Sequence, residues 1–507
     1  MKTFVKSLSC LAVSCAMGVA FGAEQMSADI VVIGAGSAGL TASVSAAEKG
    51  AKVIVLEKNA FVGGGSQFAE GVFAMESRLQ RDKADAGTRE ESFKKDMERA
   101  FWSSDANKVR DFIWGSAENI EWMMAHGVKI EFLKESVLKE PTWHVFADYK
   151  GKNHGAALIE CMKDNAEKLG VKVMTETPAV SLIKNDKGAV IGVKAKTEDD
   201  EDLRINAKKV IIATGGFGDS AEKMQQWGHR DHKLFHPSVP LNKTGDGIQM
   251  AYDVGADQHG DIAFVSHVGT PASHVPFAGD LYATSWQPSA LWVNSDGERF
   301  ADEGIALSFG LAGHAVYRQF GSQAWSIFDA NQVKYMVEQG IDSGIGVIVP
   351  PGTKLTKLAE QIEQALQKKS DGFVKANSVR DLAKKIGVPY ETLRQTIDEY
   401  NTSAEFGADR LFFKNPAWLR KLDTDNLYAI RLGTSIFCTI GGLRTNLKHQ
   451  VLDTNNKPIP NLFAAGADVS NYVSTYYNPY ASGHLFGFAC YSGRHAGANA
   501  AAELGMR

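Results

Sequence analysis

The stretch that decides the fold is Asp29-Ile30-Val31-Val32-Ile33-Gly34-Ala35-Gly36-Ser37-Ala38-Gly39. Residues 29–33 are typical of a buried strand, and the glycines follow with the spacing G-x-G-x-x-G before a helix that should end near Lys49. Gly34 permits a tight turn, Gly36 lets a pyrophosphate approach the backbone, and Gly39 lets helix and strand pack closely. The N-terminus of the helix then faces the phosphates.

A second strand is expected at residues 52–56, and Glu57 follows it directly. An acid at this place in a βαβ unit can accept hydrogen bonds from the hydroxyls of an adenosine ribose. The glycine motif alone is weak evidence. Together with both strands, the helix and the acid, it predicts dinucleotide binding.

Composition narrows the class of protein. The 507 residues include 55 Lys+Arg and 59 Asp+Glu, and the net charge is −4. The 44% hydrophobic and 22% charged residues are near globular averages and exclude a disordered or fibrous chain. This length suggests about two to four domains. A near-neutral balance without a basic block argues against nucleic-acid binding.

The N-terminus predicts export. Lys2 and Lys6 precede an apolar run at residues 8–21, and Ala20-Phe21-Gly22 offers a small-x-small cleavage site. The run is too short to span a bilayer, and a first core strand is a poor alternative because the obvious one begins at Asp29. We therefore expect a signal peptide at 1–22, a periplasmic protein, and a mature chain without a transmembrane segment.

The cysteines indicate that any redox cofactor is organic. Two of the five, Cys10 and Cys15, fall within the signal peptide, and Cys161, Cys438 and Cys490 lie far apart. They form no disulfide framework, no C-x-x-C-H haem motif and no zinc spacing.

The remaining pattern predicts an α/β protein in which a second domain interrupts the nucleotide-binding domain. Buried strands are expected at 210–213 and 462–465, each ending at glycine, and a final helix at 483–504. Residues 88–126 and most of 330–402 have helical patterns.

Further motifs occur in order along nearly the whole mature chain: Gly63-Gly64-Gly65-Ser66 with Gly71, Ala213-Thr214-Gly215-Gly216-Phe217-Gly218, Thr244-Gly245-Asp246-Gly247, Val293-Asn294 with Gly297 and Arg299-Phe300, Thr439-Ile440-Gly441-Gly442, and Leu462 to Gly466. Together they resemble the fumarate reductase/succinate dehydrogenase flavoprotein family. The likeness is closer to its soluble, exported branch, which includes fumarate and urocanate reductases and, more distantly, 3-ketosteroid dehydrogenases.

The resemblance implies a Rossmann-like FAD-binding domain at 23–261 and 438–507, and an inserted α+β capping domain at 262–437 with the substrate beneath it. FAD should be bound non-covalently. The implied contacts are Gly34, Gly36, Ser37, Ala38, Gly39, Glu57, Lys58, Gly64, Gly65, Ser66, Gly71, Ala179, Val180, Thr214, Gly215, Gly216, Asp246, Gly466, Asp468, Gly483, His484 and Leu485. Asp468 stands one residue later than the family's ribityl-binding acid, so that contact is either shifted or lost.

The chain departs from fumarate reductases where these bind the substrate. Those enzymes hold two carboxylates with arginines, which form bidentate bonds and stay charged when buried. One family histidine is retained as His267, and most of the polar catalytic positions are changed. The replacements are Leu307 for the catalytic arginine, Ala283 and Trp286 for the proton-relay residues, Phe437 or Cys438 for a histidine, and Tyr480 for the clamping arginine. Fumarate is therefore a poor candidate substrate.

We select Tyr480, Tyr477, His267 and Cys438 as candidate catalytic residues, each with a packing role as the alternative. Packing is the favoured role for Tyr472 and Tyr476, and packing or a flavin contact for His484.

The predicted protein is an exported FAD-dependent reductase of an activated carbon–carbon double bond in a monocarboxylate, aromatic enoate or enone. A separate periplasmic c-type cytochrome or quinol-linked donor would supply electrons. A dehydrogenase working in the oxidative direction and an inert flavin-binding paralogue remain as alternatives.

Overall fold

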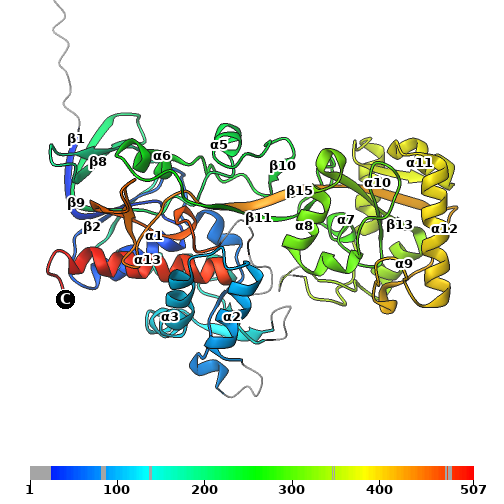
Figure 1. Cartoon of the computed structure of the whole chain (residues 1–507), viewed down its shortest axis with the longest axis horizontal. Helices are drawn as coiled ribbons and strands as arrows, with labels where there is room; N and C mark the ends of the chain where they lie inside the picture. Colours follow the sequence, from blue (N-terminus) through cyan, green and yellow to red (C-terminus); the bar gives the residue numbers. More distant parts are fainter. Residues whose placement is uncertain are drawn as a thin grey trace, which may run out of the picture.

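The structure is a computed structural model that describes residues 24–81, 87–135, 140–344, 346, 349–473, 477 and 482–507. The predicted signal peptide, Tyr476 and Tyr480 lie outside these ranges. Figure 1 shows two lobes side by side, joined by the long strand β15 (Leu427–Gly441).

The first lobe is built on a mainly parallel sheet with the order β16-β17-β9-β1-β2-β6, extended by the antiparallel strands β7 and β8. Its strands are β1 (Glu24–Ile33), β2 (Val53–Leu56), β6 (Lys172–Met174), β7 (Ala179–Lys184), β8 (Val190–Lys196), β9 (Asp202–Ile212), β16 (Gln450–Leu452) and β17 (Pro458–Ala464). β17 pairs in parallel with β9, although most of the second lobe lies between them in the sequence. Early and late segments of the chain thereby form one sheet.

Two helices of small residues cover one face of this sheet. α1 (Ser37–Ala47) and α13 (His484–Ala502) lie against each other (Figure 1). Their backbones touch closely, since a Cβ at Gly493 would meet the carbonyl oxygen of Ala38 at 2.1 Å. α4 (His154–Lys168) packs on the other side of α1. The predicted α/β class is confirmed.

A small antiparallel sheet of β3 (Gly71–Phe73), β5 (Trp143–Phe146) and β4 (Ile130–Lys134) adjoins the first lobe. Helices α2 (Arg89–Arg99) and α3 (Ala106–Ala125) pack against each other, and α3 also contacts α13. α5 (Ala221–Gln226) and α6 (Asp246–Asp253) follow β9.

The second lobe, called the cap lobe below, contains a mixed sheet with helices around it. β15 is its central strand: residues 427–433 pair with β13 (Gln323–Asp329) and β14 (Phe373–Ala376), and residues 433–441 pair with β11 (Ile262–Gly269). β12 (Leu291–Val293) and β10 (Phe235–Pro237) complete the sheet. Its helices are α7 (Asp280–Thr284), α8 (Phe309–Tyr317), α9 (Ala330–Glu338), α10 (Leu358–Gln367), α11 (Val379–Ile386) and α12 (Tyr390–Phe406).

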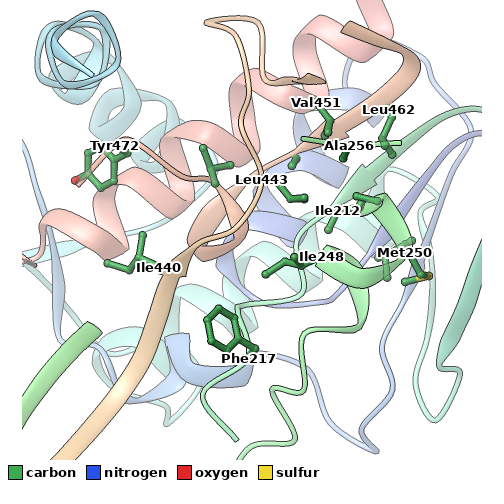
Figure 2. Packing of buried hydrophobic residues seen from close by; sticks show 14 of the residues in the cluster. Ile212, Phe217, Ile248, Met250, Ala256, Ile440, Leu443, Val451, Leu462 and Tyr472 are labelled. Atoms are coloured by element: carbon green, nitrogen blue, oxygen red, sulfur yellow. The ribbon is translucent and has the colours of Figure 1, made fainter. Parts of the chain in front are cut away.

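The largest hydrophobic core joins the parallel sheet to the base of β15. Figure 2 shows Ile212, Ile248, Ile440 and Leu462 converging from four elements. Tyr472 belongs to this core: it is 1% exposed and stacks on Phe488 with ring centroids 3.7 Å apart. Its predicted packing role is confirmed.

One strand begins earlier than expected. The sequence places the start at Asp29, whereas β1 begins at Glu24 because residues 24–28 pair with residues 203–207 of β9. In the described part of the chain, no helix combines the length and apolar character needed to cross a bilayer.

Candidate functional site

A cleft of about 970 Å³ runs from the carboxyl ends of the parallel strands to the cap lobe. One end is lined by the glycine turns of the sheet, including Gly34, Gly36 and Gly63. The other end is lined by aromatic side chains of the cap lobe, among them Tyr282, Trp286 and Phe309. A ligand that fills the cleft would therefore contact both lobes.

The glycine end is shaped for a phosphate group. Gly36 caps α1 without a side-chain hydrogen bond, and the first turn carries no acidic residue, so the helix N-terminus can bind an anion. A Cβ at Gly34 would meet the carbonyl oxygen of Ala213 at 2.3 Å, and one at Gly39 would meet that of Gly34 at 1.9 Å. Only glycine fits at these two positions.

The second glycine segment is held onto this helix. The hydroxyl of Ser66, in the short helix η1 (Gly64–Phe68), accepts a hydrogen bond from the backbone N–H of Ser37 at 3.3 Å and lies 2.8 Å from its hydroxyl. Both serines line the cleft. The predicted contacts of the two motifs are thus adjacent in space.

Glu57 also lines the cleft, at the end of β2. Its Oε2 accepts from the N–H of Ala35 at 3.0 Å and its Oε1 from that of Asn59 at 2.9 Å. The neighbouring Lys58 forms an ion pair of 2.6 Å with Asp246, the first residue of α6. The carboxylate of Glu57 is thus fixed beside the glycine turn, where a ribose can reach it.

Asp468 has a different role from the one predicted. It is fully buried and accepts hydrogen bonds from the backbone N–H groups of Thr214, Gly215 and Gly216 and from the Thr214 hydroxyl. Because its two oxygens hold this turn and it does not line the cleft, Asp468 is not placed to bind a ribityl chain. Ala467, beside it, does line the cleft.

Four other predicted contacts also lie off the cleft surface. Gly39 and Gly216 are packing positions, and Val180 is 56% exposed at the surface. His484 is buried, with Nε2 2.9 Å from Asp96 and Nδ1 bonded to the Tyr472 hydroxyl, so its ring faces the core. The remaining predicted contacts line the cleft: Gly34, Gly36, Ser37, Ala38, Glu57, Lys58, Gly64, Gly65, Ser66, Gly71, Ala179, Thr214, Gly215, Asp246, Gly466, Gly483 and Leu485.

At the aromatic end, His267 lies between two rings. It stacks on Phe437 with centroids 4.2 Å apart and on Trp286 at 5.4 Å. Its Nδ1 lies 2.7 Å from the carbonyl oxygen of Val268, to which only an N–H can bond, and its Nε2 contacts the Ser238 hydroxyl. Burial lowers the pKa of His267 to about 4, so the imidazole is neutral near pH 7.

Two further catalytic candidates reach the cleft. Tyr477 and Cys438 both line it. Burial raises the pKa of the Tyr477 phenol to about 12, opposed by a hydrogen bond from the Leu485 backbone, and raises that of the Cys438 thiol to about 11. Both groups therefore keep their protons at neutral pH. Tyr480 lies outside the described residues.

The sequence analysis did not single out Lys243, Phe309 or Ser238. Phe309 packs edge-on against Trp286 with centroids 5.0 Å apart, and Ser238 contacts His267. Lys243 lies at the cleft with its Nζ 2.6 Å from the carbonyl oxygen of Phe437. Lys243 directly precedes the Thr244-Gly245-Asp246-Gly247 motif, and this position was the one signal in the sequence that could have pointed to it.

Among the residues that the structure describes, no arginine lines this cleft. Leu307, which the resemblance predicts to replace the catalytic arginine of fumarate reductases, is 45% exposed and lines the cleft as an apolar side chain. The segment 474–481, which contains Tyr480, also has no arginine in its sequence.

Three features define a dinucleotide-binding oxidoreductase fold: the N-terminus of α1 shaped for a phosphate, Glu57 at the end of β2, and the long cleft toward a second lobe. The residues at these places fit FAD. The chain belongs to the "FAD binding domain" family, whose sequence profile matches residues 29–483. It is an FAD-dependent oxidoreductase.

Similar proteins include reductases of carbon–carbon double bonds. The chain is 35% identical over 485 residues to vinyl phenol reductase of Lactiplantibacillus plantarum, covering 94% of this chain and 97% of that protein. It is 27% identical over 487 residues to urocanate reductase of Eggerthella lenta, covering 94% and 74%.

Two solved structures have a similar fold along nearly the whole chain. An open conformation of a flavocytochrome c3 fumarate reductase superimposes with a TM-score of 0.71 at 26% identity, covering 94% of this chain and 78% of the other. A 3-ketosteroid-Δ4-(5α)-dehydrogenase from Rhodococcus jostii, in complex with 4-androstene-3,17-dione, gives 0.72 at 25% identity, covering 96% and 99%.

Proposed function

We propose that this protein reduces the carbon–carbon double bond of a small aromatic alkene, such as a vinyl phenol or an aromatic enoate. The observation that carries the proposal is the aromatic end of the cleft, where His267, Trp286 and Phe437 form a stack and no described lining residue is an arginine. The identity to vinyl phenol reductase supports the same substrate class.

The aromatic stack suits a planar substrate. Trp286 is 3% exposed and is held edge-on by Phe309, so this wall of the cleft is rigid and apolar. An aromatic ring placed against this wall would bury apolar surface, and ring contacts would stabilise the complex by about 0.5–1.5 kcal/mol more. A dicarboxylate would instead bury charge without arginine partners, at a cost of several kcal/mol per uncompensated ion.

The glycine turns at Gly34 and Gly36 with Glu57 would hold FAD, which would supply the hydride chemistry of the reduction. This chain's residues orient the substrate, exclude water and hold protons. Tyr477 keeps its phenolic proton at neutral pH and can donate a hydrogen bond where negative charge collects. His267 is neutral with both ring nitrogens engaged by protein groups, so in this scheme it supports the neighbouring Phe437 and Trp286 rings and does not transfer a proton.

We extend the proposal to export and to a separate electron donor. Residues 1–22 have the pattern of a signal peptide, and the chain contains neither a C-x-x-C-H motif nor a second nucleotide fingerprint. A periplasmic cytochrome or a quinol-linked protein would then deliver the electrons. N-terminal sequencing of the protein from a periplasmic fraction should begin near residue 23; an intact Met1 would contradict export.

The test of the reaction is a reoxidation experiment without oxygen. Chemically reduced protein is mixed with 4-vinylphenol, cinnamate, urocanate or fumarate, and the return of flavin absorbance is timed. Flavin reoxidation should be fastest with an aromatic alkene. Reoxidation by fumarate should be at least about tenfold slower, the factor that corresponds to about 1.4 kcal/mol. Free reduced FAD is the control for non-enzymatic reaction, and fumarate as the fastest substrate would overturn the proposal.

The oxidative direction is the second candidate, favoured by the likeness to the ketosteroid dehydrogenase. The oxidised protein should then be bleached by a saturated substrate such as 4-ethylphenol or a 3-ketosteroid. Bleaching faster than the reverse reoxidation would favour this second direction.

A further inference from the structure

We infer that Lys243 is the anion-binding group of the substrate end of the cleft and selects substrates that carry a single negative charge, as a carboxylate or as a phenolate. This inference rests on the proposed function, because it names the charge of the aromatic alkene. It is carried by the place of the Lys243 ammonium and by its lack of an ionic partner.

Lys243 is a buried lysine in the lining of the cleft. The residue is only 6% exposed, yet it belongs to that lining. Nζ donates to the carbonyl oxygen of Phe437 at 2.6 Å, the one hydrogen bond of this ammonium within the described ranges. An ammonium has three N–H donors, so two remain for a ligand.

The loop that carries Lys243 is held in place from below. Oδ2 of Asp219 accepts hydrogen bonds from the backbone N–H groups of Leu241 and Lys243, both at 2.8 Å. That carboxylate oxygen is engaged by the backbone, and no ion pair joins Asp219 to the ammonium in the described part of the chain. The loop therefore positions the lysine, and its ammonium makes no ion pair within the described residues.

The ammonium lies at the aromatic end of the cleft. Phe437, whose carbonyl it holds, stacks on His267. The neighbouring Cys438 thiol feels its charge: burial raises the pKa of Cys438, the Lys243 ammonium lowers it in part, and the Asp219 carboxylate raises it. A substrate ring in this aromatic part of the cleft would thus have a cation nearby.

The other two lysines of the described lining differ from Lys243. Lys58 forms its ion pair with Asp246. Lys134 is only half-buried, donates to the carbonyl oxygen of Gly346 and lies in the field of Glu70. One buried cation without an ion pair beside an apolar wall matches one anionic group on the ligand, whereas two carboxylates would leave one without a partner.

The test compares charged and neutral probes of the same shape. Lys243→Gln keeps a donor for the Phe437 carbonyl but removes the charge, and Lys243→Arg keeps the charge. The probes are cinnamate, its methyl ester and 4-vinylphenol, in the reoxidation assay described above. Lys233→Met is the matched control, since Lys233 is an exposed lysine in the preceding segment.

Loss of one charge-assisted hydrogen bond should lower kcat/KM for cinnamate about 10- to 100-fold in Lys243→Gln, with the methyl ester changed less than about threefold. Lys243→Arg should recover most of the cinnamate rate. If 4-vinylphenol alone loses rate, the charge recognised is the phenolate; if cinnamate alone does, it is the carboxylate. Equal losses for cinnamate and its ester, or no loss for any probe, would overturn the inference.

A measurement on the unaltered protein guards against a variant that fails to fold. The saturated acid 3-phenylpropanoate should bind to the oxidised protein at least about tenfold more tightly than its neutral amide, as one charged hydrogen bond allows. The change of flavin absorbance on titration measures this binding, and equal affinities would overturn the inference. If the wild-type protein reduces no aromatic alkene at all, the proposed function fails, and the binding of this ligand pair still reports separately on Lys243.

Discussion

Replacing Asp468 by alanine should weaken both folding and FAD binding. The carboxylate holds three backbone N–H groups and one hydroxyl of residues 214–216, at 2.8 Å to Gly216, 3.2 Å to Gly215 and 3.0 Å to the Thr214 hydroxyl. Each buried donor left without an acceptor costs about 1–3 kcal/mol, so three backbone donors with partial relaxation suggest about 3–6 kcal/mol. That is a large share of a typical stability of about 5–15 kcal/mol.

The effect should reach the cofactor because Thr214 and Gly215 line the cleft. Unfolding of the apoprotein by urea measures the loss of stability, and release of FAD fluorescence on dilution measures affinity. Asp468→Asn keeps the volume and one acceptor, so its loss should be smaller. Asp186→Ala, at an exposed aspartate, should change stability by no more than about 0.5 kcal/mol. Wild-type stability and FAD retention in Asp468→Ala would refute this account of the turn.

Four further predictions follow from the same structure. Gly39→Ala places a Cβ 1.9 Å from the carbonyl oxygen of Gly34, so the purified protein should lack flavin absorbance; a yellow protein would contradict this. The pKa of His267 is about 4 in the folded protein and about 6.5 in an unfolded chain, so between these pH values the unfolded chain binds one more proton. The free energy of unfolding should therefore fall by up to about 3 kcal/mol as the pH drops from 6.5 to 4. Urea unfolding at several pH values measures this slope, which His267→Gln should flatten. Tyr480→Phe should slow reoxidation by substrate about 10²–10³-fold if its hydroxyl stabilises developing charge, with a smaller loss in Tyr477→Phe, and an unchanged rate would exclude that hydroxyl. Acid precipitation should release FAD into the supernatant, whereas colour in the pellet would show a covalent link.

The dinucleotide site could be predicted from sequence because it depends on local backbone geometry. Gly34 and Gly36 sit between a strand and a helix that the hydrophobic pattern already indicates, and both line the cleft. The same holds for Ser66 and Glu57, which reach the cleft from motifs close in sequence. A βαβ unit leaves little freedom in how such residues meet.

Side-chain roles across long sequence separations could not be read from the motifs. Asp468 stands beside a cleft-lining motif, and only the pairing of β17 with β9 showed that its carboxylate turns inward to residues 214–216. Likewise His484 begins a helix at the cleft while its ring bonds to the Tyr472 hydroxyl and lies close to Asp96. A motif fixes where the backbone runs, but the packing of neighbouring elements decides which way a side chain points.

The sequence by itself determined that this chain binds FAD through a βαβ unit, because glycine spacing and residue identity are local facts. The tertiary structure alone decided the character of the substrate end. It stacked His267 between Phe437 and Trp286, removed its charge by burial, and placed the buried Lys243 in the lining of the cleft with its ammonium on the Phe437 carbonyl. Charge state and ring contacts depend on what surrounds a group in space, and that environment is assembled from segments as distant as residues 243 and 437.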